Sequence, residues 1–147
     1  MKMNGPNFRE QVRRNAVALI SLFIAVTGLL YNTWRNEHSE LNRNHRWASF
    51  EILLLLSDLR EIIYLNYYDS EQGDASDFRR GWSKVLLILD LADVLADPVP
   101  ATAVELHGTW DDNWVALKAH DKDSLDEIEE AINRLRADTL MTLQDLD

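Results

Sequence analysis

Residues 15–34 read NAVALISLFIAVTGLLYNTW, a run of 20 consecutive residues without a charged side chain. At about 1.5 Å of rise per residue, a helix of this length spans about 30 Å, the thickness of a bilayer's hydrocarbon core. The run therefore predicts a transmembrane helix. Basic and aromatic residues at its two ends are expected to anchor it at the membrane interfaces. They are Arg13, Arg14, Tyr31, Trp34 and Arg35.

Two other interpretations of this run fit less well. A cleavable signal peptide requires a small-x-small site at the end of the apolar stretch, and residues 29–34 (LLYNTW) contain none. A helix buried in a soluble core is seldom uncharged over 20 residues. We therefore expect an uncleaved, single-pass anchor surrounded by lipid, in a bacterial inner (cytoplasmic) membrane.

The basic residues on either side of the run bear on its orientation. Four Lys or Arg residues lie within positions 1–14, and three lie within positions 35–46. Under the positive-inside rule the larger number belongs in the cytoplasm. The margin of one residue favours a cytoplasmic N-terminus with the rest of the chain outside.

Small and amide side chains recur inside the run at steps of three and four residues. They are Ala18, Ser21, Ala25, Gly28 and Asn32. In an α-helix of 3.6 residues per turn these steps place all five on one face. Such a face lets two helices approach closely in lipid. We expect it to dock against another membrane protein or against a second copy of the chain.

Residues 35–46 (RNEHSELNRNHR) are polar but contain no Pro or Gly. A repeat with a mean spacing of 3.5 residues passes through them, formed by Trp34, His38, Leu41, His45, Ala48, Ile52, Leu55, Leu59 and Ile62. It predicts a helical stalk that continues the membrane helix. If the helix breaks, the break is expected at Asn42-Arg43-Asn44, because Asn favours turns and caps.

Helical periodicity continues to the end of the chain, without a strand pattern or an internal repeat. We expect helices at about 44–66, 76–96 and 101–120, and a last one that opens at Asp123 or Ser124. The segment 97–100 (DPVP) should end the second of these helices and separate it from the third. The fold predicted is all-α, a single N-terminal transmembrane helix followed by a small bundle of about four helices.

Apolar residues at helical spacing predict which faces turn inward. On the two middle bundle helices these are Phe78, Trp82, Val85, Leu86, Leu89, Ala92, Val104, His107, Trp110, Trp114 and Leu117. On the last helix they are Leu125, Ile128, Ile132, Leu135, Thr139 and Leu143. The expected organisation is a basic tail (1–14), a transmembrane helix (15–34), a helical stalk (35–46) and an acidic helical bundle (47–147).

The composition narrows the function. The chain has 147 residues, with 25 acidic residues against 15 basic ones and no cysteine. Such a balance argues against nucleic acid as a partner, because phosphate contacts require clustered Lys and Arg. The lack of cysteine excludes disulfide scaffolds, thiolate metal sites and cysteine nucleophiles. Beyond residue 15 there are 11 basic and 24 acidic residues, so the bundle is strongly acidic.

Motifs for chemistry are missing from the sequence. None of the ten glutamates has a histidine three residues later, as a di-iron bundle requires. His38 and His45 are seven residues apart, too far along one helix to share a metal. The acidic stretch that begins at Asp69 has Asp74 and Arg80 where a calcium-binding loop needs Gly and Glu. We expect no catalytic, cofactor-binding or metal-binding residues, and no cofactor.

These observations lead to one main hypothesis about function and two others. The first is a non-enzymatic, membrane-anchored helical interaction module, an accessory or scaffold subunit of a bacterial membrane complex. The second is a membrane-tethered, immunity-like binder of a basic soluble protein through the acidic bundle. The third is an enzyme or a metal-dependent sensor that uses His38, His45 or His107.

Overall fold

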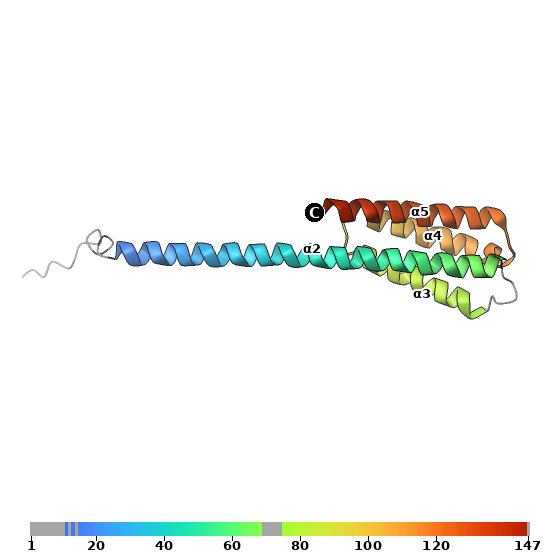
Figure 1. Ribbon diagram of the computed structural model, residues 1–147, viewed down its shortest axis with the longest axis horizontal. Helices are drawn as coiled ribbons and strands as arrows, with labels where there is room; N and C mark the ends of the chain where they lie inside the picture. The colour runs from blue at the N-terminus through green and yellow to red at the C-terminus, as the bar shows by residue number, and fades with distance from the viewer. Residues whose placement is uncertain (1–10, 12, 14, 69–74, 147) are drawn as a thin grey trace, which may run out of the picture. The chain divides into compact units, whose positions relative to one another are not determined.

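The computed structural model describes residues 11, 13, 15–68 and 75–146. Within them the chain forms four helices: α2 (Ala16–Tyr68), α3 (Ala75–Ala92), α4 (Val99–Lys118) and α5 (Lys122–Asp145) (Figure 1). No strand occurs in this part of the chain. The predicted all-α fold, with a long apolar helix at the N-terminal end and a helical bundle after it, is confirmed.

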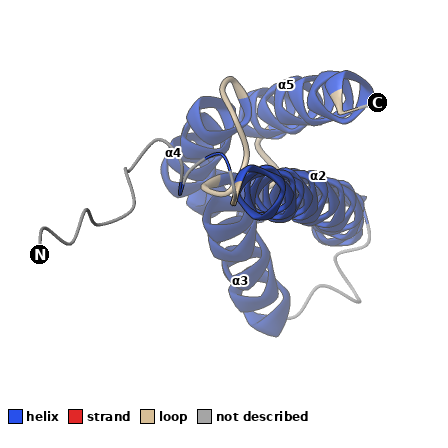
Figure 2. Cartoon of the chain, turned by 90° about the vertical axis from the view of Figure 1, so that its left-hand side faces the viewer, coloured by secondary structure: helices blue, strands red, loops and turns tan. Residues whose placement is uncertain are grey.

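The chain divides into two compact units, Met1–Leu41 and Asn42–Asp147. The described part of the first unit consists almost entirely of the beginning of α2. The second unit holds the rest of α2 together with α3, α4 and α5, which surround a common core (Figure 2). Successive helices of this second unit run in opposite directions, as short connections require.

One hydrophobic core occupies the second unit, and all four helices contribute to it. Its largest fully buried side chain is Trp110 of α4. The core is completed by Ala48, Ile52, Leu55, Leu56, Leu59, Ile63, Phe78, Val85, Ile88, Ala92, Leu95, Val99, Ala103, Leu106, Leu117, Leu125, Ile128, Ala131, Ile132 and Leu135. Burying these side chains is the main source of the bundle's stability.

The 3.5-residue repeat changes its environment along α2. From Ala48 onward its members are buried among the other helices of the same chain, including Ile52 and Leu59. Trp34 and Leu41, by contrast, are exposed. A coiled coil with a second chain can therefore use this repeat only before Ala48, because the bundle core already occupies it beyond that point.

Several helix boundaries differ from the prediction by a few residues. Residues 42–44 are helical, so the stalk continues α2 without a break at the position where a break was most to be expected. Asn disfavours a helix interior by only about 0.7 kcal/mol relative to Ala, and neither Gly nor Pro is nearby to stop the helix. Helix α3 ends at Ala92 rather than near Ala96, and Leu95 of the following turn is buried instead. Helix α4 begins at Val99, because Pro100 falls in the first turn, where no backbone N–H is needed.

Two inward-facing residues were predicted wrongly. Leu86 of α3 is 47% exposed, and the fully buried position on that face is Ile88. Val104 of α4 is 61% exposed, whereas its neighbour Ala103 and nearby Leu106 are buried. One residue corresponds to 100° of helix rotation, so a small error in phase exchanges a buried position for an exposed one. The face of α5 is correct from Leu125 to Thr139, although Leu143 is only partly buried.

The connection between α4 and α5 is fixed by a side-chain cap. The Asp121 carboxylate accepts hydrogen bonds from the backbone N–H of Ser124 at 2.8 Å and from its hydroxyl at 2.7 Å. Helix α5 therefore starts at Lys122, one residue before the predicted position. These two hydrogen bonds lower the pKa of Asp121 below its ordinary value of 3.8, because they favour the charged carboxylate.

We predict that Gly81→Ala destabilises the bundle while Gly108→Ala stabilises it. A Cβ at Gly81 would lie 2.5 Å from Cζ2 of the buried Trp110 ring, whereas one at Gly108 meets nothing within 4 Å. Overpacking at Gly81 should cost about 1–3 kcal/mol, and Gly108→Ala should gain about 1 kcal/mol of helix propensity. Urea unfolding followed by tryptophan fluorescence measures both, and similar shifts in the two variants would contradict the packing described.

A second prediction concerns the cap of α5. Asp121→Ala should lower the unfolding midpoint at neutral pH, while Asp121→Asn should not, because Asn caps as well as Asp. The folded pKa is lowered, so the charge of Asp121 stabilises the fold above about pH 3.8, and that contribution is lost as the pH falls below this value. Unfolding midpoints of the three proteins between pH 7 and pH 3 test this. Asp121→Asn should have the flatter pH dependence, and equal midpoints for all three at neutral pH would exclude the cap.

Candidate membrane anchor and interaction surfaces

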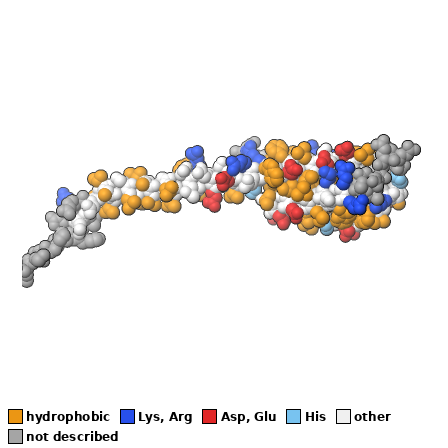
Figure 3. Space-filling model, turned by 90° about the horizontal axis from the view of Figure 1, so that it is seen from below, with side chains coloured by type: hydrophobic (Ala, Val, Ile, Leu, Met, Phe, Trp, Pro, Cys, Tyr) orange, Lys and Arg blue, Asp and Glu red, His pale blue; other side chains and the backbone are white. Residues whose placement is uncertain are grey.

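The described residues contain one helix long and apolar enough to cross a membrane, and it is α2. None of the apolar window within it is buried. Large apolar side chains such as Phe23, Ile24 and Leu29 are each more than 60% exposed. Figure 3 shows hydrophobic and uncharged side chains along this part of the first unit, between a basic residue at its start and the charged residues that follow. A soluble helix seldom exposes this much apolar surface.

Hydroxyl groups in this segment bond to their own helix. The Ser21 hydroxyl donates to the Val17 carbonyl oxygen at 2.8 Å, and the Thr33 hydroxyl donates to the Leu29 carbonyl oxygen at 3.0 Å. These contacts satisfy the hydroxyls without water, which is what a hydrocarbon environment requires. The Asn32 amide has no partner among the described residues, so it remains available to a neighbouring helix or to a headgroup.

The predicted docking face lies on one continuous helix. Ala18, Ser21, Ala25, Gly28 and Asn32 are all helical, and all are exposed. A Cβ built at Gly28 meets nothing within 4 Å, so the face is open at its centre. Its partner stays a prediction.

Aromatic rings follow one another at the C-terminal end of the apolar segment. The ring centroids of Tyr31 and Trp34 are 6.2 Å apart, and the Trp34 ring stacks on His38 with an interplanar angle of 13°. Such amphipathic rings suit the headgroup region of a bilayer. At the other end Arg13 is exposed, and the predicted anchor Arg14 lies outside the described residues. Arg35 is exposed beside Trp34 in sequence.

The histidines are dispersed. His107 packs edge-on to Trp82 with centroids 5.7 Å apart. Nδ1 of His120 lies 2.9 Å from the carbonyl oxygen of Tyr67, so the His120 ring covers the C-terminal end of α2. Within the described residues no group of three or more His, Asp or Glu side chains is arranged to hold a metal ion.

The tryptophans of α3 and α4 belong to the packing of the bundle. Trp82 contacts Trp110 and Trp114 edge-on, at centroid distances of 6.5 Å and 6.4 Å. The Lys118 ammonium lies 4.5 Å from the Phe78 ring centroid and 4.6 Å from that of Trp114. This cation–π arrangement closes one end of the α3–α4 contact.

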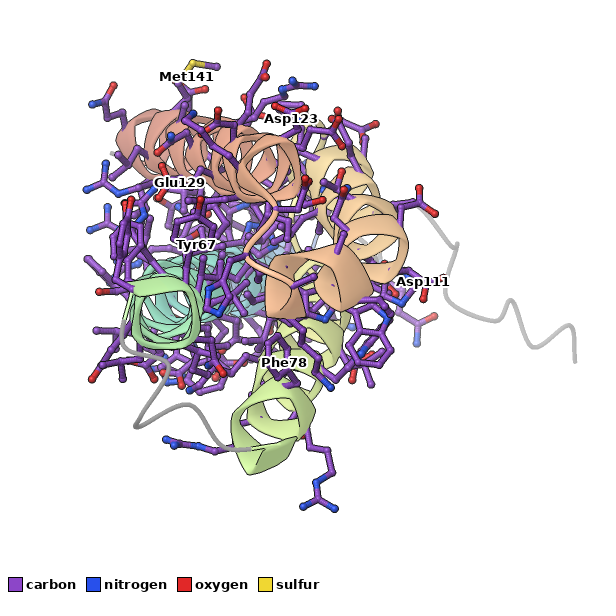
Figure 4. All side chains as sticks on the ribbon, turned by 90° about the vertical axis from the view of Figure 1, so that its right-hand side faces the viewer. Tyr67, Phe78, Asp111, Asp123, Glu129 and Met141 are labelled. Carbon is purple, nitrogen blue, oxygen red and sulfur yellow. The ribbon has the colours of Figure 1, made fainter. Side chains whose placement is uncertain are left out.

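Acidic side chains dominate the surface of α4 and α5. Positions 99–145 contain eleven acidic and four basic residues. Of the basic residues, Arg134 pairs with Glu105 and Glu130, and Lys122 pairs with Asp126. Asp111 and Asp112 are exposed and form no ion pair or hydrogen bond with the described residues. In Figure 4 Asp111 projects outward from α4.

Sequence reasoning missed a hollow between α2 and α5, lined by Leu53, Leu56, Ser57, Arg60, Ile132 and Arg136. Helical spacing groups the α2 residues, but only the tertiary fold brings Arg136 beside them. Comparisons with protein-family models, with curated proteins and with solved structures found no match to this chain.

Proposed function

We propose that the protein is a single-pass, membrane-anchored helical interaction module without enzymatic activity. It acts as an accessory or scaffold subunit of a bacterial inner-membrane complex. The observation that carries this proposal is the apolar segment of α2, none of which is buried, and which belongs to the same helix as the buried core residues of the bundle. A helix with these two environments suits a chain with one part in lipid and another in water.

In this proposal the N-terminus is cytoplasmic and the bundle lies outside. The support is the distribution of basic residues, with four in positions 1–14 and three in positions 35–46. The rings of Tyr31 and Trp34 then lie at the outer interface, and Arg13 lies at the inner one.

The membrane helix docks through the face formed by Ala18, Ser21, Ala25, Gly28 and Asn32. Small side chains give a partner helix close van der Waals contact, and the unpartnered Asn32 amide adds a hydrogen bond across the interface. The partner is another membrane protein, and a second copy of this chain is the competing occupant. Beyond Ala48 the bundle core covers the continuation of the 3.5-residue repeat, so self-association would be confined to the first part of α2.

The test is photocrosslinking from position 25 in the native membrane, with mass spectrometry of the products. A photoreactive residue at position 23, on the opposite face of the helix, is the matched control. We expect a crosslink to a different membrane protein from position 25 and a much weaker one from position 23. Crosslinks only to a second copy would make the chain a homo-oligomer, and equal yields from both positions would refute a specific docking face.

The same face can be tested by substitution. The double variant Ala25→Ile and Gly28→Ile should reduce co-purification of the partner by about tenfold or more, because two branched side chains keep the helices apart. Ala16→Ile with Thr27→Ile adds similar bulk on the opposite face and should leave co-purification intact. Both variants should stay in the membrane fraction after carbonate extraction, and unchanged co-purification of the first would contradict the docking face.

A second function is supported by the acidic surface of α4 and α5. Here the bundle binds a basic soluble protein, as an immunity-like protein would, with exposed Asp111 and Asp112 among its contacts. Charge complementarity favours a basic partner and accelerates its association. In this case the membrane helix serves only as a tether.

Salt and charge removal distinguish this alternative from helix docking. Binding through Asp111 and Asp112 should weaken by about tenfold or more between 50 and 300 mM salt, and Asp111→Asn with Asp112→Asn should weaken it at low salt. Asp90→Asn with Asp93→Asn, at exposed positions outside α4 and α5, is the control for loss of two negative charges elsewhere. Capture of a partner whose retention responds to neither change would exclude the acidic surface as the binding site.

A further inference from the structure

The hollow between α2 and α5 has a volume of about 230 Å³. Its α2 residues are spaced by three, one and three positions, which places them on one face of the helix: Leu53, Leu56, Ser57 and Arg60. Its α5 residues, Ile132 and Arg136, lie one turn apart. Two adjacent, oppositely directed helices therefore hold one shared concavity.

The hollow has an apolar floor and a basic rim. Leu56 and Ile132 are each 1% exposed, and Leu53 is partly buried beside them. Two guanidinium groups, those of Arg60 and Arg136, and the Ser57 hydroxyl supply its polar part. Such a combination of apolar wall and a few convergent polar groups is characteristic of small-molecule sites.

Several hydrogen-bond donors at this rim lack an acceptor among the described residues. Nη2 of Arg60 donates to Oδ1 of Asn133 at 2.7 Å, which holds the guanidinium in place. Nε of Arg60 is buried and has no acceptor among the described residues. Arg136 and Ser57 likewise form no hydrogen bond or ion pair with that part of the chain. Arg136 and Ser57 are exposed to solvent, so the cost of a buried donor without a partner falls on Nε of Arg60, and this group favours an acceptor from outside.

One acidic side chain, that of Glu129, lies near Arg60, since both act on the Tyr64 phenol, and its Oε1 is buried without a hydrogen-bond partner among the described residues. Glu129 lies one turn of α5 before Asn133, and in Figure 4 it is found between α5 and α2. Its carboxylate accepts a hydrogen bond from Tyr64, which raises the pKa of the Tyr64 phenol. Neither Arg60 nor Arg136 forms an ion pair with a carboxylate of the described residues.

We propose that this hollow binds a small amphipathic monoanion, a carboxylate carried on a short alkyl chain. Arg60, Arg136 and Ser57 hold the carboxylate, since guanidinium groups match the planar geometry of that anion. Leu53, Leu56 and Ile132 cover the alkyl chain. The volume is below the ~300–1,000 Å³ of pockets for drug-sized ligands, which limits the chain to a short one. A compact inorganic anion would leave the apolar floor uncovered.

The probe is sodium octanoate, titrated by calorimetry into the full chain in nanodiscs of zwitterionic lipid, with empty nanodiscs as the blank. We expect saturable binding that Arg136→Gln weakens by about tenfold, the loss of one charge-assisted contact. Arg79→Gln, an exposed arginine on α3, is the matched control and should bind as the original protein does. Arg60→Gln should weaken octanoate binding by a similar factor. If the Arg60→Gln protein does not fold, the test depends on Arg136→Gln alone.

Two further ligands separate the parts of the proposal. Octan-1-ol has the same chain without the charge, and inorganic phosphate has charge without the chain, so both should bind at least tenfold more weakly than octanoate. Equal binding of octanol would reduce the hollow to an apolar groove, and equal binding of phosphate would reduce it to a simple anion site. Either result overturns the proposal, as does octanoate binding that Arg136→Gln leaves unchanged.

Discussion

Helix α2 has to satisfy two different surroundings with one backbone. Where its side chains are apolar on every side, the helix bonds its peptide groups internally, as a bilayer would require. Where α2 enters the bundle, only one face is apolar, and that face meets α3, α4 and α5. The polar residues at 35–46 lie between the apolar segment of α2 and its bundle segment. The bundle depends on this second segment of α2, because it contributes Ile52, Leu56 and Leu59 to the core.

The other three helices pack against the bundle segment of α2 and stabilise it. Trp110 fills the centre, and it fits because Gly81 of α3 presents no side chain at that point. The ring is used for its volume, since its buried Nε1 finds no acceptor among the described residues. Contacts at the periphery fix the order of the helices, such as the ion pair between Lys84 and Asp58 and the hydrogen bond from Asn113 to Glu127. Exposed pairs of this kind add little stability but help to specify which faces meet.

The elements that sequence predicts well are those with a strong local signal. An uncharged run of 20 residues identifies the apolar part of α2, and periodicity gives the face of α5 from Leu125 to Thr139. Errors arise where the signal is weak or not local. Ala103 is 1% exposed whereas the larger, more apolar Val104 is 61% exposed, so side-chain type alone does not identify the inward face of α4. The 3.5-residue repeat can be seen in the sequence along its whole length, but only the fold reveals that the helices of the same chain cover it from Ala48 onward.

Charge is the property for which sequence and structure differ most in what they imply. A net charge of −10 argues against a polyanionic partner, because long-range repulsion acts over the whole of such a ligand. A small anion is governed by groups within a few ångströms, since at physiological salt more distant charges are screened beyond about 8 Å. Arg60 and Arg136 are 76 positions apart in the chain. Composition cannot reveal that they share a hollow, and an acidic protein can therefore hold a basic site.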